Sequence, residues 1–331
     1  MYLFVIVFAI LFILSICLFD IGSTFSKEKM PTLKALMAII IVLGHLSTRV
    51  TTGWIQPFRF WGAPFVSMFL FISGYGMWQN FESHSGLSFL STLKRVWGIL
   101  LPYLLTVLLY YLIVRIPSHE TLTDIREIIA TGTSNQSHLW FVFAIIYLYF
   151  AFYCCTRLKN KVHVVALLFA VVAATIVLLR GVGYDRCWYV SLLAFPTGCL
   201  YSMNKEQINR VVFRSRWTYT LAILLAVAGV GLTYLTRVEV LYSVSHIFIP
   251  IAMALILIQL PYERFNNRLT KHLGAVSYEI YLCQMIAMDA LHLFFPELRP
   301  GAYIFLTLAV TLLLAEFEGI ILDKLKMISK P

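Results

Sequence analysis

Long apolar runs recur along this chain of 331 residues and constrain its fold more than any other feature. A helix that crosses the hydrocarbon core of a bilayer needs about 20 mostly apolar residues, and about eleven runs approach that length. The runs are continuously apolar and do not alternate with polar residues, which favours helices over a membrane β-barrel. The predicted spans are residues 3–19, 33–50, 62–79, 97–115, 138–153, 162–180, 188–203, 217–236, 242–260, 276–295 and 302–322.

The low charge content supports the same fold class. Hydrophobic residues make up 60% of the chain and charged residues only 13%, with a mean hydropathy of +0.83. Soluble domains average about 25% charged residues, so this chain cannot cover a water-facing surface of its own size. The composition excludes a soluble enzyme, a nucleic-acid reader and a disordered tail. We expect an all-α integral membrane protein, a polytopic bundle that forms a single membrane domain over residues 1–331.

The cysteine pattern predicts neither a disulfide framework nor a metal centre. The six cysteines form no C-x-x-C pair, and none stands at zinc-ligand spacing from a histidine. We therefore expect no metal cofactor.

The basic residues predict the orientation in the membrane. The first run lacks a basic segment before it and a small-residue cleavage pattern, so we interpret it as a retained helix and not as a signal peptide. If the N-terminus lies outside, eighteen of the 26 basic residues fall on the cytoplasmic side, which agrees with the positive-inside rule. The prediction is a multi-pass protein of the cell (plasma or inner) membrane with a cytoplasmic C-terminus. The eight basic residues on the external side are Arg49, Arg59, Arg115, Arg126, Arg180, Arg186, Arg237 and Arg299.

Ionisable side chains within membrane spans are costly, so each of them is a candidate functional group. Glu316 and Glu318 approach the cytoplasmic end of the last span, and we expect both to snorkel toward water. The remaining candidates are His45, Arg49, His246, Glu279, Asp289 and His292.

The spacing of Lys34 and His45 suggests an elongated ligand. Eleven residues correspond to about three helical turns, which places both side chains on nearly the same helix face, roughly 16 Å apart along the axis. The positive charge lies at the cytoplasmic mouth and the imidazole deeper in the bilayer. By depth in the tenth span, Asp289 is level with His45 and is a candidate to orient its ring, whereas Glu279 is level with Lys34 and is a candidate partner for it.

The motif Lys34-x10-His45, within KALMAIIIVLGHLS, resembles the Arg-x10-His signature of the membrane acyltransferase 3 family. Four more stretches resemble family segments in the expected order, so the resemblance covers a core of about ten helices over residues 30–322. Residues 1–29 would then add one extra N-terminal helix and its loop. The four stretches are GAPFVSMFLFISGYGM, FLSTLKRVWGILLPYLL, HLWFVFAIIYLYF and VSYEIYLCQMI.

Three positions depart from the family pattern. Lys34 replaces the usual arginine, which keeps a positive charge but loses bidentate recognition of phosphate. Gly98 or Ile99 stands where the basic segment usually carries a second arginine, and Gln284 stands where many members carry a late histidine. The first two departures bear on how an acyl donor that carries phosphate is held. The third bears on any mechanism that needs a second histidine.

The resemblance implies a membrane O-acyltransferase that uses cytoplasmic acyl-CoA, most often acetyl-CoA. The acceptor would be a hydroxyl of a cell-surface glycan or of its lipid-linked precursor. His45 would act as a general base or through an acyl-imidazole. The depth argument, and not the resemblance, makes Asp289 the second candidate catalytic residue, as the group that orients His45. Membrane lipid is an expected partner, nucleic acid is not, and homo-oligomer formation stays open. The candidate substrate-binding residues are Lys34, Arg59, Ser73, Lys94, Arg95, Trp140, Glu279 and Tyr281.

Plainer interpretations stand beside these. Ser73 could serve helix packing, and Trp140 could belong to an interfacial aromatic belt. A second function class is also open, a transporter or flippase of a glycan precursor or proton-coupled solute, in which buried histidine and carboxylates form a proton relay. Transporters often carry inverted repeats with helices broken at matching positions, and this sequence shows neither.

Overall fold

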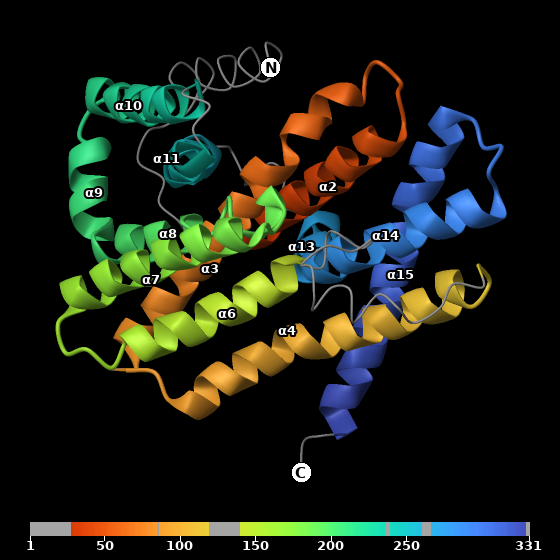
Figure 1. Cartoon of the computed structure of the whole chain (residues 1–331), viewed down its shortest axis with the longest axis horizontal. Helices are drawn as coiled ribbons and strands as arrows, with labels where there is room; N and C mark the ends of the chain where they lie inside the picture. Colours follow the sequence, from red (N-terminus) through yellow and green to blue (C-terminus); the bar gives the residue numbers. More distant parts are fainter. Residues whose placement is uncertain (1–27, 85, 119–139, 236–238, 260–265, 329–331) are drawn as a thin grey trace. The chain divides into compact units, whose positions relative to one another are not determined.

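The computed structural model describes residues 28–84, 86–118, 140–235, 239–259 and 266–328. The predicted span at 3–19, and with it nearly all of the extra N-terminal segment 1–29, lies outside these residues. Within the described residues the chain is all-helical and contains no strand. The predicted helical class is confirmed for this part of the chain (Figure 1).

A helix is present in each of the ten core runs predicted from the sequence. Short helices η1 (Gln56–Phe60), η4 (Arg186–Trp188), α9 (Lys205–Val212) and α13 (Arg268–Ala275) lie between them. The ten runs correspond to α2 (Met30–Arg49), α3 (Gly62–Ser83), α4 (Phe89–Tyr110) with its continuation η2 (Tyr111–Arg115), α6 (Trp140–Cys155), α7 (Lys161–Val182), α8 (Ala194–Met203), α10 (Arg216–Leu235), α11 (Glu239–Ile258), α14 (Ser277–Phe294) and α15 (Pro300–Ile328).

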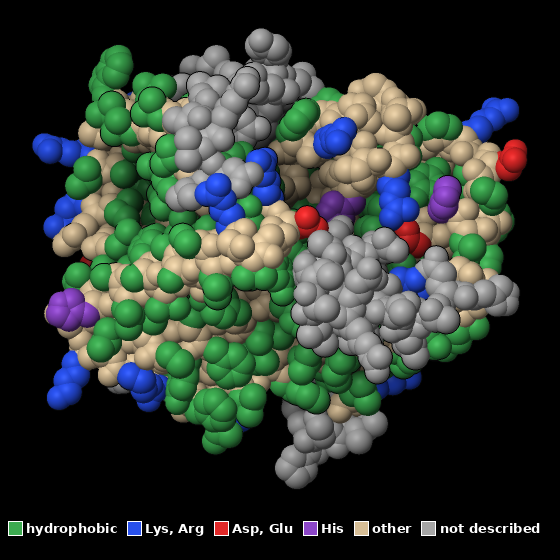
Figure 2. Space-filling model, viewed as in Figure 1, with side chains coloured by type: hydrophobic (Ala, Val, Ile, Leu, Met, Phe, Trp, Pro, Cys, Tyr) green, Lys and Arg blue, Asp and Glu red, His purple; other side chains and the backbone are tan. Residues whose placement is uncertain are grey.

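Five of the described helices are long and apolar enough to cross a membrane by length and composition, and two shorter helices are also apolar. The chain is therefore a multi-pass membrane protein, whereas the number of eleven spans stays a prediction. α8 has 10 residues and extends about 15 Å, half of the hydrocarbon core. Figure 2 shows hydrophobic side chains crowded over the outward sides of α6 and α7, a surface suited to lipid.

The helices group into two compact units that interleave along the sequence. Unit 1 comprises Met1–Met30, Ala63–Leu93 and Phe143–Asn266, and unit 2 comprises Pro31–Gly62, Lys94–Val142 and Asn267–Pro331. α4 and α6 each contribute residues to both units.

In unit 1, glycines bring the backbones of α3 and α8 into direct contact. A Cβ atom on Gly74 would lie 2.1 Å from the Phe195 carbonyl oxygen, and one on Gly198 would lie 2.0 Å from the Phe71 carbonyl oxygen. The Cys199 thiol donates a hydrogen bond across this contact to the Gly74 carbonyl (3.3 Å). Small residues allow this close approach, which is a common way to pack helices in membranes.

In unit 2, an apolar core joins α2, α14 and α15. A Cβ on Gly274, in the short helix α13, would lie 2.0 Å from the Pro31 carbonyl oxygen, so α13 abuts the first turn of α2. The buried core residues are Ala38, Val42, Leu46, Val50, Ile55, Ile280, Met285, Met288, Leu291, Tyr303, Ile304 and Ala315. This core holds the helices that carry most of the candidate site.

The predicted orientation can be tested with single cysteines. In a parent freed of the six native cysteines, Ser118→Cys and Gln207→Cys should be labelled from opposite sides of the membrane by an impermeant maleimide, because alternating loops place residue 118 outside and α9 inside. Labelling of intact and opened cells gives the comparison. Labelling of both residues from the same side would contradict the eleven-span topology.

Candidate active site

Helix α2 carries both ends of the predicted ligand path. It runs without a break from Met30 to Arg49, so the three-turn spacing of Lys34 and His45 is preserved. Lys34 is half-buried and forms no ion pair or hydrogen bond with a residue that the structure describes. Nδ1 of His45 is buried and likewise finds no hydrogen-bond partner among the described residues. A cation and an imidazole nitrogen on one helix thus have no partner among the described residues.

The segment after α2 folds back on the turn that carries His45. The Gln56 amide donates to the carbonyls of Ser47 (3.1 Å) and Val50 (2.6 Å), which caps the C-terminal end of α2. A Cβ on Gly44 would lie 3.2 Å from the Phe58 carbonyl oxygen, so the residue before His45 packs tightly on η1. The exposed Arg59 belongs to the same short helix.

A charged cluster joins three helices one turn beyond His45. The Arg49 guanidinium forms a salt bridge with Asp289 Oδ1 (2.7 Å), and the Tyr110 hydroxyl donates to Asp289 Oδ2 (3.0 Å). The Arg115 guanidinium lies over the Tyr110 ring, 5.7 Å from its centroid. Asp289 therefore ties α14 to α2 and α4.

The cluster changes how Asp289 relates to His45. Both of its carboxylate oxygens have partners, and neither partner is His45. Arg49 lies four residues after His45, on the same face of α2. The structure thus links Asp289 to the histidine's helix through Arg49, and a direct role of Asp289 as the orienter of His45 stays a prediction.

The basic residues collect at the opposite end of unit 2. The Tyr278 hydroxyl donates to the Ile99 carbonyl (3.1 Å), which joins the first turn of α14 to the part of α4 one turn after Arg95. The short helix α13 abuts the start of α2 and leads directly into α14. One end of unit 2 therefore contains the Lys34 end of α2, the Arg95 turn of α4 and the start of α14. Lys94 is exposed and Arg95 half-buried. Glu279 lies in the first turn of α14, but the expected pair with Lys34 is not formed.

The remaining candidates have different surroundings. Trp140 and Tyr281 are buried, and both pack on Phe141, with ring centroids 6.0 and 5.3 Å away. Trp140 thus contacts protein in unit 2. Ser73 belongs to unit 1, half-buried beside Gly74 at the α3–α8 contact. Gln284, at the position of the late histidine, is buried and donates to the Tyr281 carbonyl (2.8 Å).

Sequence reasoning missed Glu318. The expectation that it snorkels is wrong, because its side chain is fully buried. The Thr106 hydroxyl lies 2.9 Å from Oε1 and 3.1 Å from Oε2 of Glu318, and it donates to this carboxylate. The Cys283 thiol donates to Oε2 (3.0 Å). Glu316 is more exposed and pairs with His272 (2.5 Å). A helical stripe in the sequence could have revealed Glu318, since the buried positions of α15 include Thr307, Thr311, Ala315, Glu318 and Leu322.

The described residues contain no group of three histidine, cysteine or acidic side chains placed to hold a metal ion. A comparison with protein families finds a match over residues 30–315 to the acyltransferase 3 family, whose model is described as an acyltransferase domain. The chain belongs to the acyltransferase 3 family. No curated protein and no solved structure matches it. This acyltransferase is therefore an enzyme, and the transporter interpretation is set aside.

Proposed function

We propose that this acyltransferase moves an acetyl group from acetyl-CoA on the cytoplasmic side to a hydroxyl of a cell-surface glycan or its lipid-linked precursor, with His45 as the reactive centre. The observation that carries the proposal is the pair of unsatisfied groups on α2. The Lys34 ammonium has no counter-ion and His45 Nδ1 no hydrogen bond among the described residues. Such groups inside a membrane protein favour a ligand that supplies both partners.

The donor fits the length and charge of this end of unit 2. Lys34, Lys94 and Arg95 would hold the phosphates of CoA by charge-assisted hydrogen bonds. The pantetheine arm would then extend along α2 over the roughly 16 Å that separate Lys34 from His45. Glu279, in the first turn of α14, would contact the polar part of the donor.

The reaction needs one proton to move. The acceptor hydroxyl loses its proton to the His45 imidazole, its oxygen bonds to the thioester carbonyl carbon, and the C–S bond breaks. The imidazolium then protonates the departing CoA thiolate, which leaves the histidine neutral again. In a two-step route, an imidazole nitrogen bonds to the thioester carbonyl carbon and the C–S bond breaks, so that CoA leaves with the proton of the imidazole N–H. The acceptor hydroxyl then attacks this acyl-imidazole, the C–N bond breaks, and the hydroxyl proton returns to the imidazole.

The other candidates would serve the acceptor and the histidine. Asp289, through Arg49 and Tyr110, would hold the end of α2 in place and stabilise charge near the imidazole. Arg59, in the segment after α2, would contact the acceptor, and Trp140 and Tyr281 would shape the apolar wall. Ser73, in unit 1, is the remaining candidate substrate-binding residue. The same proposal places the protein in the plasma or inner membrane, in contact with lipid and with its N-terminus outside. It leaves open whether the protein forms a homo-oligomer.

Lys34 provides a test of the donor end. Lys34→Ala should weaken acetyl-CoA binding, and the loss should shrink as salt rises, because salt screens the pairing of an ammonium with phosphate. Lys34→Arg should bind at least as well as the native chain, since arginine adds a bidentate contact. Calorimetric titration at low and high salt measures both, with Lys324→Ala, an exposed lysine of α15, as the matched control. Normal binding by Lys34→Ala together with loss of activity in Lys34→Arg would remove Lys34 from the donor site.

A further inference from the structure

Unit 1 holds a second buried polar centre that the proposed mechanism does not use. His246 in α11 is 1% exposed, Ser67 in α3 is fully buried, and Ser191, before α8, is 1% exposed. Nδ1 of His246 lies 2.5 Å from the Ser67 hydroxyl oxygen and 3.4 Å from that of Ser191. Polar groups buried among apolar helices are costly unless they are paired or bind a ligand.

The hydrogen bonds determine which ring nitrogen is left over. Because the Ser67 hydroxyl has a single proton and donates it to the Ala63 carbonyl (2.9 Å), we assign the N–H of His246 to Nδ1, from which the Ser67 oxygen accepts. In the neutral ring, Nε2 then keeps its lone pair. This nitrogen is buried and has no hydrogen-bond partner among the described residues, and the same holds for the hydroxyl of Ser243.

The two unpartnered groups belong to residues one turn apart on α11. Ser243 precedes His246 by three residues and so shares its face of α11. One group is a hydrogen-bond acceptor and the other a hydroxyl that can donate. A ligand hydroxyl satisfies both at once, because it donates to Nε2 and accepts from Ser243. A carboxylate or phosphate oxygen would instead face the lone pair of Nε2, and an apolar group would leave both atoms unpaired.

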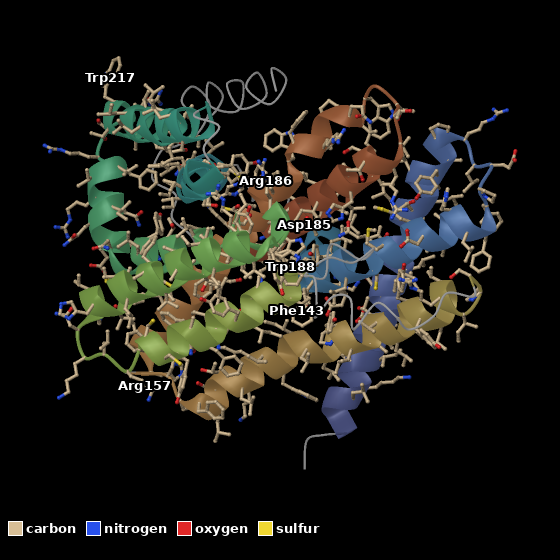
Figure 3. The ribbon with its side chains drawn as sticks, in the orientation of Figure 1. Phe143, Arg157, Asp185, Arg186, Trp188 and Trp217 are labelled. Carbon is tan, nitrogen blue, oxygen red and sulfur yellow. The ribbon has the colours of Figure 1, made fainter. Side chains whose placement is uncertain are left out.

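The neighbouring surface has features that suit a sugar. Ser191 follows Trp188 by three residues, and η4 and the turns after it connect them. Trp188 packs beside Phe143, with ring centroids 6.1 Å apart (Figure 3). The ring of Tyr184 lies on the same tryptophan, with centroids 5.5 Å apart. Asp185 and Arg186 are exposed on the same turn. Aromatic faces pack on the apolar faces of sugar rings, and carboxylate and guanidinium groups hydrogen-bond hydroxyls.

We propose that His246 and Ser243 bind a hydroxyl of the acyl acceptor, a sugar, so that unit 1 supplies an acceptor subsite. This inference rests on the proposed transfer to a glycan hydroxyl. The predicted topology supports it, since Ser67, His246 and η4 all lie toward the external ends of their segments, where a cell-surface glycan would arrive. His246 binds in this role and carries no acyl group.

Steady-state kinetics of the full-length protein in lipid nanodiscs test the subsite, with acetyl-CoA and a glycan acceptor that the native enzyme modifies. His246→Gln should raise the KM for the acceptor roughly tenfold, the loss expected for one hydrogen bond, and leave the KM for acetyl-CoA unchanged. Ser243→Ala should raise the KM for the acceptor about threefold, because its hydrogen bond is the weaker of the two contacts. Ser245→Ala is the matched control, because this buried serine of α11 already donates to the Tyr242 carbonyl (2.6 Å). It should leave both KM values within about twofold.

The outcomes separate this inference from the function on which it rests. If the native enzyme transfers no acetyl group to any glycan, the proposed function fails. If it does, and the KM for the acceptor is unchanged in Ser243→Ala and in His246→Gln, the subsite is wrong and an ordered water fills it. If His246→Gln and Ser243→Ala raise the KM values for acceptor and donor equally, and Ser245→Ala does the same, then His246 and Ser243 have a structural role only. Should His246→Gln not fold, the comparison of Ser243→Ala with Ser245→Ala decides.

Discussion

Replacing His45 by alanine is expected to reduce acetyl transfer to background while the protein still inserts and binds acetyl-CoA. In the proposed mechanism the imidazole takes the proton of the acceptor hydroxyl or carries the acyl group, whereas the donor phosphates would be held about three turns away at Lys34. Loss of a general acid–base group costs about a hundredfold to ten-thousandfold in rate. Single-turnover transfer from labelled acetyl-CoA measures the loss, with His292→Ala, an exposed histidine of α14, as the control.

Two further results decide what His45 does. A rate within about tenfold of the native enzyme, a barrier change under about 1.4 kcal/mol, would make His45 a structural residue. Label trapped on His45 when no acceptor is present would establish the two-step route. Label that never appears on the protein, combined with an inactive His45→Ala, would favour general-base catalysis.

The second large effect is expected at Asp289. Asp289→Asn keeps the size of the side chain but removes the negative charge that pairs with Arg49 at 2.7 Å. The maximal rate at saturating donor should fall about tenfold to a hundredfold, as for other groups that orient a reactive residue through a partner. Acetyl-CoA affinity should be nearly unchanged, because the proposed contacts to the donor phosphates, Lys34, Lys94 and Arg95, lie at the other end of unit 2. Asp323→Asn, an exposed aspartate of α15, is the matched control.

A double-mutant cycle distinguishes the route of this effect. If Asp289 acts through Arg49, then Arg49→Gln should lower the maximal rate by a similar factor, and the double variant should be little worse than either single one. Additive losses would mean that the two residues act independently. If Asp289→Asn reacts normally, the residue that orients His45 must be sought on another helix.

The sequence predicts the helices well because membrane spans are defined by local composition. Each of the ten core runs contains a helix, since backbone groups in lipid must be bonded within the segment. The Lys34–His45 relation was also predictable, because both residues lie on one helix of known periodicity. The depth argument paired Asp289 with His45, whereas the structure pairs it with Arg49, one helical turn after His45 on α2.

Contacts between helices were less accessible. No periodicity shows which helix faces which, so the pairing of Asp289 with Arg49 and Tyr110, and not with His45, could not be derived. Glu318 was assigned to the membrane surface from its depth alone, although its position on the buried stripe of α15 was readable. The link between Ser67 and His246, 179 residues apart, likewise needs the packing of α3 against α11.

The most direct test of the central claim is acetyl transfer itself. Purified protein in nanodiscs is incubated with acetyl-CoA labelled in the acetyl group and with a panel of glycan and lipid-linked glycan acceptors, and the label is followed into each acceptor. The proposal predicts label on the hydroxyl of at least one glycan, released CoA in equal amount, and no label with His45→Ala. Labelling of a glycan by His45→Ala at the native rate, or no labelling of any glycan by the native enzyme, would contradict it.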